Sequence, residues 1–85
     1  MDAVHIVYDG QTQDLELEDL IPMEDRAGLG IEDDTELHSK DLNSEQIKRA
    51  LANHYDKPVT EFEELIVEFH KSGDITVRPN AIFGT

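Results

Sequence analysis

The sequence lacks cysteine, and lysine and arginine together account for only 7 of its 85 residues. Without cysteine there is no disulfide framework and no thiolate zinc site, and cysteine usage gives no information about the redox compartment. No apolar run approaches the roughly 18 residues that cross a bilayer. The opening MDAVHIVYDG has neither the basic leader nor the apolar stretch of a signal peptide. We therefore expect a cytoplasmic protein without a membrane segment.

Catalytic motifs are also missing from the sequence. It contains no GxSxG, P-loop, HExxH or GxGxxG pattern, so we predict a protein that is not an enzyme and that binds no cofactor. Gly28-Leu29-Gly30 lacks the third glycine of a dinucleotide motif and lies among acids that repel phosphate. The acidic run 32–36 lacks the spacing of a calcium loop. The four histidines are dispersed along the chain, and no metal site is predicted. They are His5, His38, His54 and His70.

Acidic residues dominate what is present. Twenty Asp and Glu give a net charge of −13, and residues 1–41 hold 13 of these acids. Such repulsion destabilises a small fold at low salt and is screened at molar salt, where the Debye length is about 3 Å. The composition resembles that of proteins from halophilic archaea, which implies adaptation to high salt. Nucleic-acid binding is disfavoured, although five basic residues in the second half could form a modest patch. They are Lys48, Arg49, Lys57, Lys71 and Arg78.

Residues 4–20 are predicted to form a β-hairpin around Asp9-Gly10. Both central residues of a type I′ turn need positive φ, a requirement that Asp-Gly pairs commonly meet. Pairing Tyr8 with Gln11 collects the apolar side chains on one face and sends His5, Glu16 and Glu18 to the other. The apolar set is Val4, Ile6, Tyr8, Leu15 and Leu17.

The middle of the chain contains one well-signalled helix. Residues 22–27 are expected to form a short helical turn closed by Gly28 or Gly30, followed by an acidic loop anchored by Leu29, Ile31 and Leu37. A longer helix then starts at the N-cap Asn43. Gln46 completes a capping box, Leu42 and Ile47 form a hydrophobic staple, and Pro58 ends the helix. Its apolar stripe is Ile47, Ala50, Leu51, His54 and Tyr55.

Residues 59–70 fit two structures. The apolar spacing and a Thr60–Glu63 capping box suit a helix, whereas LIVEFH is rich in β-forming residues. We favour a turn or short helix near 60–63 followed by a strand over 65–70.

A second hairpin is predicted around a three-residue loop, 71–73. With Gly73 in a left-handed conformation, His70 pairs with Asp74, and the apolar residues of both strands share one face. Glu68 and Arg78 come within reach of each other on the opposite face.

These elements predict an α+β fold, a two-layer ββαββ sandwich in which one main helix packs on a sheet of two β-hairpins, in a single domain 1–85. The C-terminal strand is expected at an exposed edge, with Pro79 limiting pairing beyond it. The apolar tail that follows either covers the chain's own core or anchors a partner. The candidate partner-binding residues are therefore Arg78, Ile82 and Phe83.

Two hairpins flanking a helix in a short acidic chain resemble the β-grasp fold of ubiquitin-like and sulfur-carrier proteins. The family's C-terminal Gly-Gly is replaced here by Phe83-Gly84-Thr85, so the resemblance implies the fold and assigns no functional residue. The leading hypothesis is a non-catalytic module that binds an unknown protein partner, or a second copy of itself, at high salt. The alternatives are a ubiquitin-like modifier or carrier, and a nucleic-acid-associated regulator.

Overall fold

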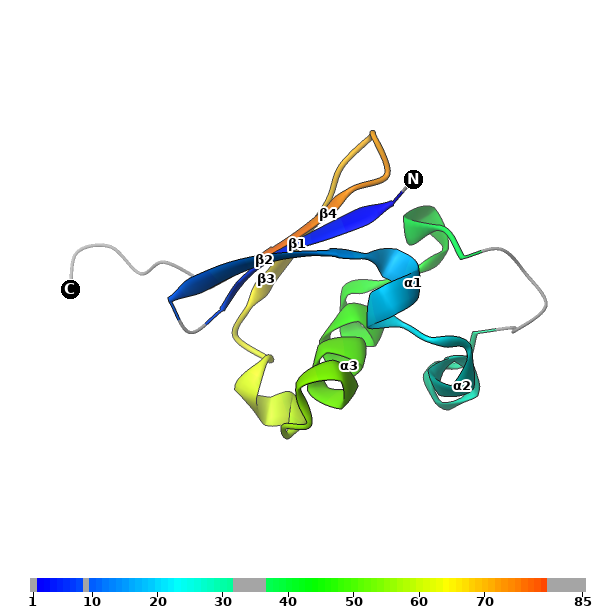
Figure 1. The fold of residues 1–85 in the computed structure, drawn as a ribbon, viewed down its shortest axis with the longest axis horizontal. Coiled ribbons are helices and arrows are strands. Elements are labelled where there is room, and N and C mark those ends of the chain that lie inside the picture. The colour runs from blue at the N-terminus through cyan, green and yellow to red at the C-terminus, as the bar shows by residue number, and fades with distance from the viewer. Residues whose placement is uncertain (1, 9, 32–36, 80–85) are drawn as a thin grey trace.

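The computed structural model describes residues 2–8, 10–31 and 37–79 (Figure 1). They form an α+β structure in which a four-stranded mixed sheet carries its helical segments on one side. The predicted α+β class is confirmed, and several short helical segments accompany the longest helix. The elements are β1 (Ala3–Tyr8), β2 (Gln11–Glu16), α1 (Leu17–Leu20), α2 (Met23–Arg26), η1 (Ala27–Leu29), η2 (Ser39–Asp41), α3 (Ser44–Tyr55), η3 (Val59–Glu61), β3 (Ile66–Phe69) and β4 (Ile75–Arg78).

The strands are ordered β2-β1-β4-β3 across the sheet. Both hairpins are antiparallel, and they join through parallel pairing of β1 with β4, which sets Val4 opposite Ile75. The prediction that the C-terminal strand lies at an edge is therefore wrong, because β2 and β3 occupy the two edges. Ile75 and Val77 are fully buried, which favours a central strand, whereas the polar start of β2 suits an edge.

The first hairpin has the predicted register, with Tyr8 opposite Gln11. Its strand ends at Glu16, four residues before the end of the predicted segment, and Leu17 begins the helical turn α1 instead. Leu17 and Leu20, three positions apart, then both reach the core. The N–H of Leu17 donates to the carbonyl of Asp2, which fixes this change of direction. The prediction that Leu17 lies on the strand was wrong, although its burial was expected.

The second hairpin also has the predicted register. Phe69 lies opposite Ile75, and the N–H of His70 donates to the carbonyl of Asp74 at 2.9 Å. Gly73 has φ +99°, the left-handed conformation expected of it. The ambiguous stretch before this hairpin is a short 3₁₀ turn, η3, followed by the strand β3, as favoured above.

The connecting segments follow their local signals. Gly30 closes α2 and η1 with φ +76°, and Leu29 and Leu37 are buried. The acidic run 32–36 lies outside the described residues. In α3, the Asn43–Gln46 capping box is present in both directions. The helix ends before Pro58, because Asp56 adopts a left-handed conformation.

The core lies between the sheet and α3. Phe62 and the inward-facing residues of β1 and β4 are fully buried, and Tyr8 and Tyr55 extend this core as an aromatic group around Phe62. His54, predicted on the apolar stripe, is exposed instead. The buried residues contributed by α3 are Ile47, Ala50, Leu51 and Ala52.

Candidate functional site

The described helical segments all lie on one side of the sheet, and none of them covers its other face (Figure 1). We call this surface the open face. The strand register arranges its side chains in three rows that run from β2 to β3. The rows are Glu16–Ala3–Asp74–His70, Asp14–His5–Thr76–Glu68 and Thr12–Val7–Arg78–Ile66.

His5 lies between two carboxylates on the open face. Its Nδ1 is 2.7 Å from Asp14 Oδ1 on β2, and its Nε2 is 3.8 Å from Asp74 Oδ2 beside β4. The hydrogen bond to Asp14, with the negative charges of both acids, raises the pKa of His5 above its ordinary value of 6.5. The imidazolium form would therefore link β1 to β2 and to the residue that precedes β4.

Arg78 and Glu68 pair across β4 and β3, as the register predicted. Arg78 Nε donates to Glu68 Oε1 at 3.0 Å, and a second guanidinium nitrogen lies 3.5 Å from Oε2. This contact raises the pKa of Arg78 and lowers the pKa of the Glu68 carboxyl. Of the three predicted partner-binding residues, Arg78 lies on the open face, whereas Ile82 and Phe83 fall outside the described residues.

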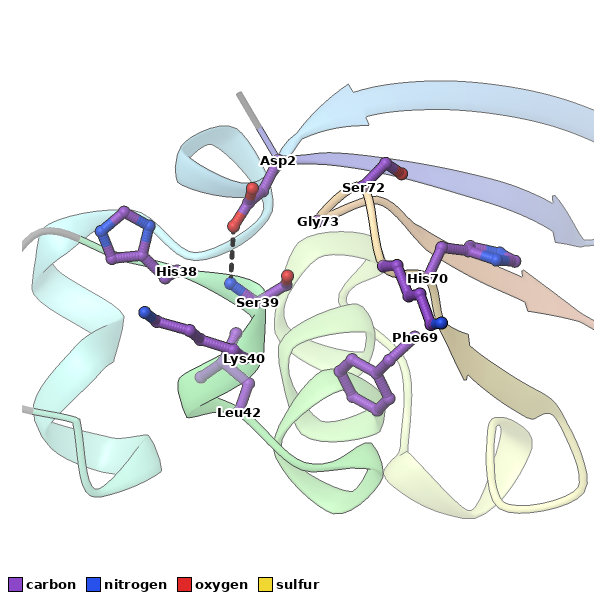
Figure 2. A pocket seen from close by; sticks show the side chains of 10 residues that line it. Asp2, His38, Ser39, Lys40, Leu42, Phe69, His70, Ser72 and Gly73 are labelled. Atoms are coloured by element: carbon purple, nitrogen blue, oxygen red, sulfur yellow. Dashed lines mark hydrogen bonds between the residues drawn. The ribbon is translucent and has the colours of Figure 1, made fainter.

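A pocket of about 430 Å³ lies on the helical side of the sheet, between η2 and the β3–β4 turn (Figure 2). Asp2 connects the two walls of this pocket. Its Oδ2 accepts a hydrogen bond from the N–H of Ser39 at 2.6 Å, and its carboxylate also lies next to Gly73. Figure 2 shows the ring of Phe69 beside this space, while the ring of His70 turns away toward the open face. There His70 Nε2 lies 2.7 Å from the Thr76 hydroxyl.

The rim of this pocket carries positive charge in a strongly acidic protein. Lys40 and Lys71 both line it, together with His38. Among the residues that the structure describes, no carboxylate lies within ion-pair distance of either lysine. Phe69 is 42% exposed, one of two large apolar side chains with substantial exposure in the described part of the chain.

The structure separates the other residues that the sequence analysis grouped. Lys48, Arg49 and Lys57 belong to α3 and the turn after it, whereas Arg78 lies on the open face across the sheet. His5 and His70 share the open face. In the described ranges, no three His, Asp or Glu side chains are arranged to hold a metal ion.

Sequence reasoning missed the pocket altogether. It is built by residues far apart in the chain, and Asp2 and Ser39 carry no recognisable motif. The only local signal was Gly73, which was interpreted as a turn residue.

Comparisons with models of known protein families, with curated proteins and with solved structures give no match to this chain. Within the described residues, no helix combines the length and apolar character needed to cross a membrane.

Proposed function

We propose that this chain is a small, non-catalytic, cytoplasmic module that binds a protein partner through the open face of its sheet. The observation that carries the proposal is the composition of the open face. It combines apolar side chains, Val7 and Ile66, with charged groups held in place by cross-strand pairing, including Arg78 with Glu68. Pre-positioned charges beside apolar area suit specific recognition of a protein surface.

Charge reversal on the open face tests the proposal. We expect the wild-type chain, used as bait in its own cells at native salt, to retain a partner that Arg78→Glu loses. Arg49→Glu makes the same charge change at an exposed position of α3 and should retain the partner. Circular dichroism establishes that both variants fold. Retention of the same partner by a folded Arg78→Glu variant would overturn the open face as the binding surface.

A second copy of the chain is the alternative occupant of this face. Light scattering on purified protein distinguishes the two, because self-association doubles the mass without another component. In that case Arg78→Glu should return the protein to a monomer.

We further propose that the protein is adapted to concentrated salt. The support is its net charge of −13, whose repulsion is screened as the Debye length shortens to about 3 Å near 1 M salt. The free energy of unfolding should rise with KCl. A free energy that falls or stays constant between low and molar KCl would contradict this adaptation.

We also propose that the layout is a β-grasp-like ββαββ arrangement with a single main helix. Its support is the joining of the two hairpins in one sheet and the packing of α3 on one face of it. The ubiquitin-like alternative, a modifier or carrier, is tested by the intact mass of the protein from its own cells. A conjugate or a thiocarboxylate would favour that alternative over a binding module.

A further inference from the structure

The two edges of the sheet differ in how well they are protected against a further strand. The β2 edge, QTQDLE, is mostly polar and carries Asp14 and Glu16. The β3 edge, IVEF, has Glu68 as its only charged residue, and that carboxylate already pairs with Arg78. Sheet edges are commonly blocked by lysine, proline, unpaired charge or a bulge. Strand β3 has none of these features.

The backbone of β3 has hydrogen-bonding groups directed outward. The backbone N–H of His70 donates to Asp74. Because the antiparallel ladder alternates, the backbone N–H and C=O groups of Glu68 and Ile66 point toward β4 as well. The N–H and C=O groups of Val67 and Phe69 consequently point away from β4. No strand of the described sheet lies on that side of β3. Two donors and two acceptors are therefore directed toward an incoming strand.

The pocket beside Phe69 lies on the same side of the sheet as the inward-facing side chains of this edge. Val67 and Phe69 face the helical layer, and Phe69 lines the pocket with Leu42, the residue that follows η2 (Figure 2). Alternate side chains of a strand added to β3 would enter this layer, because successive residues of a strand point to opposite faces. Such strand addition draws affinity from the main chain and specificity from the pockets.

Charge identifies the kind of strand that fits. The pocket rim carries Lys40 and Lys71, neither with a carboxylate at ion-pair distance in the described ranges, and Asp2 is engaged by the N–H of Ser39. The remainder of the protein repels acidic chains, since its net charge is −13. An acidic segment would therefore be attracted to this rim and disfavoured at the β2 edge with its own acids.

We propose that the edge of β3 and the adjoining pocket bind an extended segment of a partner protein, in which apolar residues alternate with Asp or Glu. The segment extends the sheet by pairing with Val67 and Phe69. Its carboxylate side chains face the helical layer near Lys40 and Lys71, and its apolar side chains point to the opposite side of the sheet. The outward backbone groups of this edge and its two lysines are distinct from the charged pairs of the open face, so the inference stands or falls independently of the function proposed above.

Amide NMR provides the test, with the peptide Ac-Glu-Val-Glu-Val-Glu-Val-NH₂ as the probe and its Lys-for-Glu counterpart as the control. The titration uses the lowest KCl concentration at which the amide spectrum is that of the folded protein. We expect the acidic peptide to shift the amide resonances of Val67 and Phe69 and to slow their hydrogen exchange. The amide of Glu68 should keep the protection that its bond to β4 already gives. The lysine peptide should produce neither effect.

Matched variants test the role of charge and of the pocket. Lys71→Glu should weaken binding of the acidic peptide about tenfold at low salt, with a smaller difference as KCl is added. Arg49→Glu, the same charge change on α3, should leave the affinity unchanged. Phe69→Ala should also weaken binding, because it removes the exposed ring against which the methylene groups of the glutamate side chains would pack.

Three results would overturn the proposal. The first is that the amide resonances of Val67 and Phe69 do not change at millimolar concentrations of the acidic peptide. The second is that the peptide shifts only amide resonances of β2. The third is protection of Val67 and Phe69 without peptide in a protein of doubled mass, which would assign the edge to a second copy of this chain.

Discussion

The two faces of the sheet are built from the same four strands and differ in nearly every other respect. On the helical side, Val4, Ile6, Ile75 and Val77 are completely buried. On the open face the neighbouring residues of the same strands form hydrogen-bonded charged pairs that water still reaches. Strand alternation thus divides the sheet into an apolar face that stabilises the fold and a charged face that we propose as the binding surface.

The strongest test of this difference is a matched pair of truncations on β1. Ile6→Ala should cost about 2–5 kcal/mol in the free energy of unfolding, because it leaves a cavity among fully buried side chains. Val7→Ala, one residue along on the open face, should cost about 0.5 kcal/mol. Denaturant unfolding at high KCl measures both values. Similar losses would mean that the open face also contributes to the core.

The next largest effect is expected where the β3–β4 turn meets Asp2. Gly73→Ala combines a left-handed φ of +99° with a clash against the Asp2 carboxylate, and should cost about 1–3 kcal/mol. Gly10→Ala is the control, since Gly10 has φ +76° but open space around it. Thermal melts should show the larger loss for Gly73→Ala. An equal loss would indicate that backbone strain alone matters there.

A smaller effect with a distinct pH dependence is expected at His5. Its raised pKa means that the charged pair stabilises the fold fully below pH 6.5 and less as the pH rises through the folded-state pKa. The stability advantage of wild type over His5→Gln should therefore be greater at pH 5.5 than at pH 8.5. Asp14→Asn should abolish most of this difference, because Asp14 makes the closest contact. A stability advantage of wild type that grows with pH would contradict a raised pKa for His5.

The smallest effect, with the opposite pH dependence, is expected at Glu68. Its pKa lies below the usual 4.5, chiefly because of the hydrogen bond from Arg78. The ion pair therefore stabilises the fold fully above pH 4.5, and its contribution is lost as the pH falls through the folded-state pKa of Glu68. Wild type should exceed Glu68→Gln in stability at pH 6, and by a smaller margin at pH 3. Glu64→Gln, at an exposed acid outside the strands, is the control.

Much of the local structure could be predicted from the sequence because each signal lies within a few residues of the element it specifies. The Asn43–Gln46 capping box and the positive-φ glycine of the 71–73 loop are examples. The same register arguments correctly predicted that Glu68 lies within reach of Arg78. Leu17 was the exception, because the alternation of apolar and acidic residues in LELEDL predicts that the strand continues through it. The hydrogen bond from the N–H of Leu17 to the carbonyl of Asp2 fixes the change of chain direction there.

By itself, the sequence determined the two hairpins, their registers, the capped helix and the excess of negative charge. Each depends on turn chemistry, alternation or composition, all of which are local. Only the tertiary structure decided that β4 lies inside the sheet and that β3 forms an edge, because parallel pairing of β1 with β4 joins segments about 70 residues apart. It likewise brought Asp2, Ser39 and Gly73 together around one pocket. No spacing in the sequence records such contacts, since they exist only once the hairpins and helix have packed.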